Sequence, residues 1–92
     1  MVTESMKMLR IIWENGEVST KELAKSLSKS LSLVHGIGLL LIGRKLAIKV
    51  TRRENVNGIF PQSVCYWTIK PSQKERALRK LREAYQDVPN PV

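Results

Sequence analysis

The spacing of the apolar residues changes twice along this chain, and these changes limit the folds that it can adopt. Up to Ile42 the apolar side chains recur at every third or fourth residue, which is typical of one face of a helix. From Leu46 they stand at every second residue, as in a half-buried strand, and from Pro71 the helical spacing returns. The sequence therefore predicts a fold of class α+β, mainly α, in which short helices pack against a β-hairpin.

This fold must rest on a hydrophobic core. The only cysteine, Cys65, cannot form an internal disulfide, and one histidine, His35, is too little for a zinc cluster, so we expect neither metal nor cofactor. The 92 residues suffice for a single core. The longest apolar stretch is far shorter than a membrane span and no signal-peptide pattern is present, so we expect a cytoplasmic protein without membrane contact.

Capping and turn residues mark the ends of the predicted helices. The first ends at Asn15-Gly16, and the second begins with a capping box in which Ser19 and Glu22 exchange hydrogen bonds with each other's backbone. The four predicted helices cover 4–15, 19–28, 28 or 30 to about 42, and 71–85. Their inward-facing residues are Met6, Leu9, Ile12, Trp13, Leu23, Ala24, Leu27, Val34, Ile37, Leu41, Ala77, Leu78, Leu81, Ala84 and Tyr85.

Two strands are predicted, over 46–51 and 64–69. Between them the chain is polar, Asn57-Gly58 is a strong turn signal, and Pro61 is expected to prevent regular pairing. We therefore expect a turn-rich segment over 52–62 that carries Arg52 and Arg53 at the tip of the hairpin. In the second strand Cys65, Trp67 and Ile69 share one face, and Trp67 is expected to anchor the core.

The charge of the chain indicates an anionic partner. Sixteen lysines and arginines stand against eight acidic residues, which gives a net charge of +8. The positive excess is the same in residues 1–50 as in 51–92, so the basic character belongs to the whole domain. A broadly basic surface attracts polyanions, of which nucleic acid is the commonest.

The order of elements and a set of residues within it resemble the winged helix-turn-helix domains of MarR/ArsR-type regulators. The resemblance covers about residues 5–70, and its motif is moderately specific. The family commonly shows E-L-A, L, S, S-x-V, L and R-G-L where this chain has Glu22-Leu23-Ala24, Leu27, Ser30, Ser32, Val34, Leu41 and Arg44-Lys45-Leu46. The last helix, within 71–86, is similar to the dimerisation helix of small bacterial, archaeal and archaeal-virus members, and 87–92 is expected to be a flexible tail.

The resemblance implies a regulator of transcription that binds double-stranded DNA as a homodimer. The third helix would enter the major groove, and the hairpin wing would reach adjacent phosphates or the minor groove. The predicted DNA-binding residues are Lys29, Ser30, Ser32, His35, Arg44, Lys45, Arg52, Arg53 and Asn55. The predicted dimerisation residues are Leu78, Leu81 and Tyr85.

The third helix departs from the family pattern on its outward face. Family members usually present Arg, Lys, Gln or Asn there, but this chain has Leu31, Leu33, Gly36 and Leu39. Direct reading of bases should therefore be weak, with phosphate contacts and DNA shape supplying most of the affinity. The same leucines support an alternative, a protein–protein interaction module in a transcription or replication assembly.

Three further expectations complete the sequence-based account. Gly36 and Gly38 each cost about 1 kcal/mol relative to alanine inside a helix, so we expect a DNA backbone, a partner protein or the first helix to pack closely there. The basic face of the last helix is open to two interpretations, DNA contact or solubility. The chain has no paired-carboxylate, phosphate-loop or nucleophile motif, so we expect no enzymatic activity.

Overall fold

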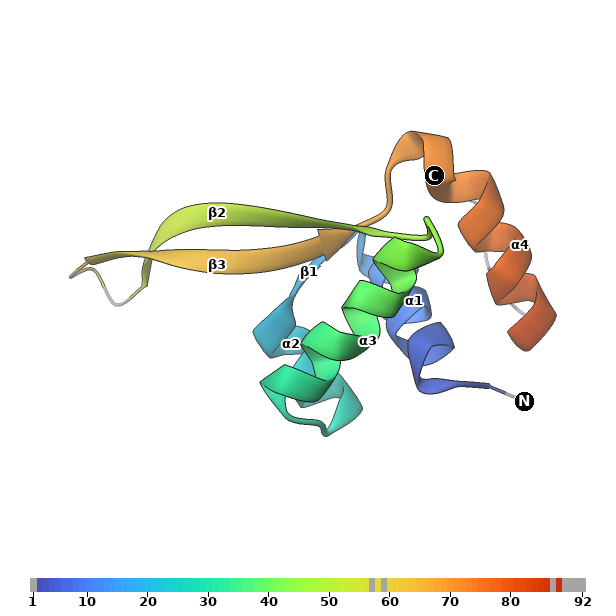
Figure 1. Ribbon diagram of the computed structural model, residues 1–92, viewed down its shortest axis with the longest axis horizontal. Coiled ribbons are helices and arrows are strands. Elements are labelled where there is room, and N and C mark those ends of the chain that lie inside the picture. Colours follow the sequence, from blue (N-terminus) through green and yellow to red (C-terminus); the bar gives the residue numbers. More distant parts are fainter. Residues whose placement is uncertain (1, 57, 59, 87, 89–92) are drawn as a thin grey trace.

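A computed structural model describes residues 2–56, 58, 60–86 and 88, without the side chains of 56 and 60. Within these residues a group of helices packs against the near end of a small antiparallel sheet, and a long hairpin projects from the group (Figure 1). The elements are α1 (Glu4–Asn15), β1 (Glu17–Ser19), α2 (Thr20–Leu27), α3 (Leu31–Gly43), β2 (Ile48–Val56), β3 (Phe60–Thr68), a 3₁₀ turn (Pro71–Gln73) and α4 (Lys74–Ala84). This order confirms the predicted one, except that the expected extended link after α1 forms a strand.

The first three helices begin at side-chain caps. Thr3, Ser19 and Ser30 each accept a hydrogen bond from the backbone N–H three residues further on, over 3.3, 3.1 and 3.2 Å. Between α2 and α3 the chain turns at Ser28, which adopts a left-handed conformation with φ of 55°. A residue in that conformation cannot open a right-handed helix, so α3 starts after Ser30, the second of the two predicted positions.

The core is organised around Trp67, whose side chain is completely buried. Its indole N–H donates to the hydroxyl of Thr20 over 2.8 Å, which ties β3 to α2. Its ring lies against α3 at Gly38, where a Cβ atom would come within 2.3 Å of the ring. The close contact expected at this glycine is therefore made by Trp67, which is none of the three candidates. The other buried apolar residues are Met6, Met8, Leu9, Ile12, Val18, Leu23, Val34, Leu41, Leu46, Ala47, Ile69, Ala77, Leu81 and Val88.

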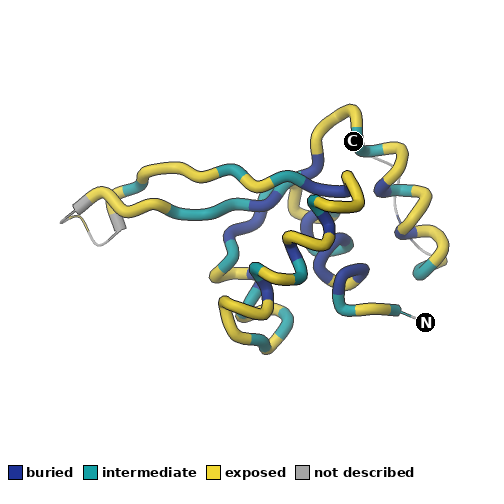
Figure 2. The backbone as a smooth tube through the Cα atoms, in the orientation of Figure 1, coloured by how far each residue is buried: buried dark blue, intermediate teal, exposed yellow. Residues whose placement is uncertain are grey.

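The strand order in the sheet is β1-β3-β2, and the β2–β3 pairing runs from Ile48 opposite Thr68 to Val56 opposite Phe60. The predicted turn-rich segment over 52–62 is wrong, because most of it belongs to these two strands. Pro61 pairs with Asn55. Because β1 pairs only with 66–68 of β3, the strand has one neighbour at Pro61 and is an edge strand there, which is where proline is tolerated in sheets. Figure 2 shows why the segment is polar: beyond the helices the hairpin is mostly exposed.

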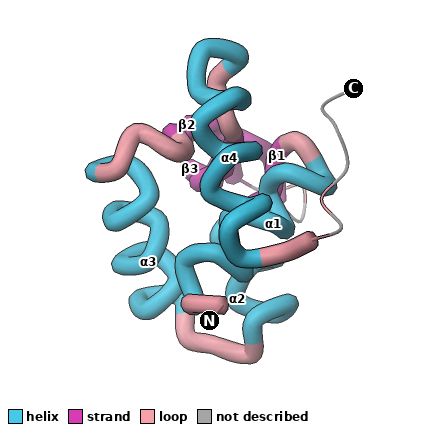
Figure 3. The backbone as a smooth tube through the Cα atoms, turned by 90° about the vertical axis from the view of Figure 1, so that its right-hand side faces the viewer, coloured by secondary structure: helices cyan, strands magenta, loops and turns pink. Residues whose placement is uncertain are grey.

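Helix α4 packs against α1 of the same chain (Figure 3). Its apolar stripe points into this contact, and Leu81 is completely buried there. Leu81, a predicted dimerisation residue, is thus covered within one chain and has no exposed surface to offer to a second copy. Tyr85 is half-buried and its ring lies 4.3 Å from the guanidinium carbon of Arg10. The predicted tail lies outside the described residues except for Val88, which is buried.

Candidate nucleic-acid interface

Helix α3 presents an uncharged, largely apolar face. The exposed residues that recur at intervals of three or four along it are Ser32, Leu33, Gly36, Leu39, Leu40 and Gly43, and we call them the outer stripe. The leucines of the outer stripe are 58%, 49% and 56% exposed at positions 33, 39 and 40. The outward placement predicted for Leu33, Gly36 and Leu39 is confirmed, whereas Leu40 was not predicted. Leu31 is 55% exposed too, but it lies off the stripe in the first turn.

The inner side of helix α3 is apolar as well, since it is formed by Val34, Gly38 and Leu41. No single helix within the described residues is long and apolar enough to cross a membrane. In the part of the chain that the structure describes, one pair of helices, Thr20–Leu27 and Leu31–Gly43, has sufficient length and apolar composition together, but it is bent by 106° between the two helices.

His35 lies on the side of α3 that faces the hairpin. Its ring is edge-on to that of Trp67, with the centroids 5.8 Å apart, and its Nε2 atom lies 3.4 Å from Nζ of Lys49. An ammonium group only donates, so this contact holds when the imidazole nitrogen accepts. Lys49 was missed as a site residue. The signal was its position opposite Trp67 in the strand pairing, which places both side chains on the face toward α3.

The alternation of side chains along β2 divides the predicted wing residues between two faces of the sheet. Arg53 and Asn55 lie an even number of residues from Lys49 and therefore share its face, the one toward α3. Both side chains are exposed. Within the described part of the chain, Arg53 has no ion-pair or hydrogen-bond partner, so its guanidinium is available to an external anion.

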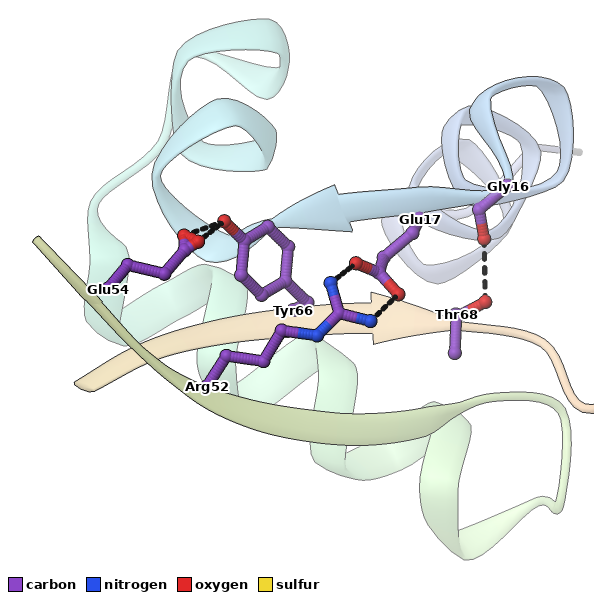
Figure 4. A network of polar contacts seen from close by, with 6 residues as sticks. All are labelled: Gly16, Glu17, Arg52, Glu54, Tyr66 and Thr68. Atoms are coloured by element: carbon purple, nitrogen blue, oxygen red, sulfur yellow. Dashed lines mark hydrogen bonds and ion pairs between the residues drawn. The ribbon is translucent and has the colours of Figure 1, made fainter.

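Arg52 points to the opposite face, where it belongs to a polar network (Figure 4). Its guanidinium pairs with both carboxylate oxygens of Glu17, with Nη2 to Oε2 at 2.8 Å, and lies 5.1 Å from the ring centroid of Tyr66. The hydrogen bond to Glu17 raises the pKa of Arg52, and the hydrogen bond that the Tyr66 hydroxyl donates to Glu54 raises the pKa of that tyrosine. The expected place of Arg52 and Arg53 at the hairpin tip is wrong, because both lie within β2, where Arg52 braces that strand against β1.

The predicted cations on either side of α3 differ in their contacts. Lys29, before the helix, places Nζ 3.7 Å from Oε2 of Glu4, so its charge is partly offset. Arg44 and Lys45, after the helix, are exposed and their side chains form no ion pair with any described residue. Lys45 adopts a left-handed conformation with φ of 58°, which turns the chain from α3 toward β2.

The predicted site residues thus lie in three places. Lys29, Ser30, Ser32 and His35 lie before or on α3, and Arg44 and Lys45 follow it. Arg53 and Asn55 lie on the face of the hairpin that is turned toward α3. Ser30 caps α3 through its hydroxyl oxygen, which leaves the hydroxyl proton free to donate. Lys49 belongs with this group, and Arg52 does not.

The comparisons with known proteins identify the fold. No family model matches the sequence, and no curated protein is similar to it. The crystal structure of NadR in complex with 4-hydroxyphenylacetate is similar, with a TM-score of 0.64 and 17% identity over 94% of this chain. A possible transcriptional regulator from Methanosarcina mazei Go1 matches with a TM-score of 0.61 and 17% identity over 95% of this chain. The matches cover 59% of the NadR chain and 72% of the other.

The chain has the winged-helix fold of these two structures. In a winged-helix fold, the β2–β3 hairpin corresponds to the wing, and α2 and α3 correspond to the helix-turn-helix. The predicted fold class is confirmed, including the additional helix after the wing.

Proposed function

We propose that this protein binds duplex DNA and regulates transcription, with α3 in the major groove and the wing beside it. The observation that carries the proposal is the set of exposed cations around an uncharged helix: Arg44 and Lys45 follow α3, and Lys49 and Arg53 stand on the wing face toward it. The net charge of +8 supports an anionic partner. The fold shared with a possible transcriptional regulator supports DNA as that partner.

The dimensions suit a duplex. Helix α3 has 13 residues, which makes it about 20 Å long, and the major groove is about 12 Å wide. Arg53 lies four residues beyond Lys49 along β2, a distance of about 13 Å. The cations can therefore meet phosphates that border the groove while α3 lies within it, and phosphate contacts supply the main part of the affinity.

We further propose that the protein acts as a homodimer through α4. Leu78 is half-buried on α4 and Tyr85 is half-buried at its end, so both keep surface for a second copy after Leu81 has packed against α1. A two-fold dimer would place two α3 helices in successive major grooves. The MarR/ArsR relationship and a cytoplasmic location remain predictions from the sequence, as does the absence of enzymatic activity.

Fluorescence anisotropy of a labelled random-sequence duplex, titrated at several salt concentrations, tests the proposal. We expect binding at low salt, with the logarithm of the association constant falling linearly with the logarithm of the salt concentration. Arg53→Ala should reduce this slope by about 0.9, the contribution of one phosphate contact. Arg52→Ala is the matched control, because its guanidinium is held by Glu17, and it should leave the slope unchanged. Absence of binding at low salt would contradict the proposal.

A further inference from the structure

The outer stripe of α3 lacks the groups with which proteins usually read bases. Its one polar side chain is that of Ser32, and α3 as a whole carries no lysine, arginine, asparagine or glutamine. Guanine and adenine are typically recognised by bidentate hydrogen bonds from those residue types. A serine hydroxyl discriminates poorly between bases. Recognition by this face must therefore use something other than hydrogen bonds to base edges.

The major groove has one apolar feature, the C5-methyl group of thymine, which 5-methylcytosine also carries. Leu33, Leu39 and Leu40 expose about half of their surface or more and stand within two turns of one another. Contact between such side chains and a row of methyl groups removes apolar surface on both partners from water. The exposed leucines are therefore chemically complementary to the methyl groups in the major groove.

The glycines of the outer stripe point to a surface that comes close to the helix backbone. A Cβ atom added at Gly36 or at Gly43 would meet no described atom within 4 Å, so packing inside the chain does not require either glycine. Glycine weakens a helix, yet Gly36 stands at the middle of the exposed face. An absent side chain there lets an external surface approach the backbone between Leu33 and Leu40.

The charges around the stripe indicate which surface this is. Arg44 and Lys45 stand beyond one end of α3, and Lys49 and Arg53 stand along the wing, all four exposed. An apolar strip bordered by cations is complementary to a groove whose floor carries methyl groups and whose borders are phosphates. The charge pattern thus favours DNA over a protein partner as the occupant of the stripe.

We propose that the outer stripe of α3 reads C5-methyl groups, so that the preferred ligand is duplex DNA with closely spaced thymines, or 5-methylcytosines, in the major groove. This inference rests on the proposed function, since it assigns the specificity of the same surface. Leu33, Leu39 and Leu40 are the specificity-determining residues, and Gly36 permits the approach.

The test compares two A·T-rich duplexes that differ only in thymine against deoxyuridine, which has the same hydrogen-bonding edge but no methyl group. Their affinities are measured by fluorescence anisotropy at one salt concentration. We expect the thymine duplex to bind more tightly, by on the order of fourfold for each contacted methyl, from the transfer free energy of one such group. Replacing cytosine by 5-methylcytosine in a G·C-rich duplex should raise the affinity in the same way.

Variants assign the effect to the stripe. Leu33→Ala and Leu39→Ala should lower the preference for thymine over deoxyuridine, and both should fold because these side chains are exposed. Leu31→Ala is the matched control, equally exposed but off the stripe, and should keep the full preference. Gly36→Ala should raise Tm and yet weaken binding to the thymine duplex, an opposition that a merely structural role would not produce.

The outcomes separate the inference from the function beneath it. Salt-dependent binding with equal affinity for the thymine and deoxyuridine duplexes overturns the inference and leaves the DNA-binding function standing. A preference for thymine that survives in Leu33→Ala and Leu39→Ala also overturns it, and leaves the leucines as a protein-docking face. Failure to bind either duplex overturns the proposed function and the inference together.

Discussion

Gly38 and Gly36 lie two residues apart on one helix, and substitution by alanine should have opposite effects at the two positions. At Gly38 a new Cβ atom would stand 2.3, 2.5 and 2.7 Å from three ring atoms of Trp67. The ring is completely buried and its N–H is bonded to Thr20, so it cannot retreat without losing that hydrogen bond or shifting the sheet. At Gly36 the new atom would meet no described atom within 4 Å.

The magnitudes follow from these contacts. Extra volume in a packed core costs about 1–3 kcal/mol, and the short distances to Trp67 place Gly38→Ala at the upper end of this range. Alanine recovers about 1 kcal/mol of helix propensity relative to glycine. In Gly38→Ala the packing cost exceeds the gain in helix propensity, so the free energy of unfolding should fall by about 2 kcal/mol. In Gly36→Ala only the gain remains, and the free energy of unfolding should rise by about 1 kcal/mol. In a domain of this size these changes correspond to a Tm lower by about 8–16 °C and higher by about 4–8 °C, respectively.

Thermal unfolding followed by circular dichroism measures both variants against the parent protein. Near-ultraviolet spectra of the folded proteins add a signal from the environment of Trp67, which should change in Gly38→Ala and remain unchanged in Gly36→Ala. A Tm of Gly38→Ala equal to or above that of the parent would refute the close packing of α3 on Trp67. The two variants would then have no reason to differ.

Two further predictions concern α4 and the polar network. Leu81→Arg should unfold the domain, since it places an unpaired charge in the core. Leu78→Arg should stay folded and sediment as a monomer. A folded Leu81→Arg protein would contradict the packing of α4. The hydrogen bond to Glu54 raises the pKa of Tyr66, so in a Tyr85→Phe background the phenolate absorbance should develop above the usual pH for tyrosine, and Glu54→Gln should bring it back down. The stabilisation from this hydrogen bond is complete below the ordinary tyrosine pKa and is lost as the pH rises through the raised value; identical titrations with and without Glu54→Gln would argue against the contact.

The helices could be predicted from the sequence because their signals are local. The capping side chain of Ser19 and the turn at Asn15-Gly16 mark helix ends, and apolar spacing defines the inner faces. The role of Gly38 could not be predicted in this way, because its partner, Trp67, lies 29 positions further along the chain. A glycine in a helix indicates that something comes close, but only the fold shows what it is.

The wing was wrongly predicted as a turn-rich segment because polar residues are typical both of loops and of strands that are exposed on both faces. A strand that leaves the body of the protein is solvated on both faces, so it lacks the apolar alternation by which strands are recognised. The adjacent arginines were therefore expected to act together at a tip, whereas strand geometry sends Arg52 to Glu17 and Arg53 to the face toward α3. Once the strand is known, alternation alone separates them.

The apolar stripe of α4 was correctly predicted, but the element that buries it was not. The pattern shows that Leu81 must be buried and does not show whether α1 or a second chain buries it. The outer stripe of α3 posed the reverse problem. Leu33 and Leu39 were expected to be outward and Leu40 was not, and the structure leaves about half of each of these three side chains exposed.

The central claim is that α3, together with the face of the wing that is turned toward α3, forms the DNA-binding surface. Backbone amide chemical shifts, recorded by NMR during titration with a thymine-containing duplex at low salt, test it most directly. The account predicts that the largest changes fall on the outer stripe of α3, on 44–45 and on Lys49 to Asn55, with small changes along α4. Changes concentrated on the basic face of α4, with α3 unaffected, would contradict it.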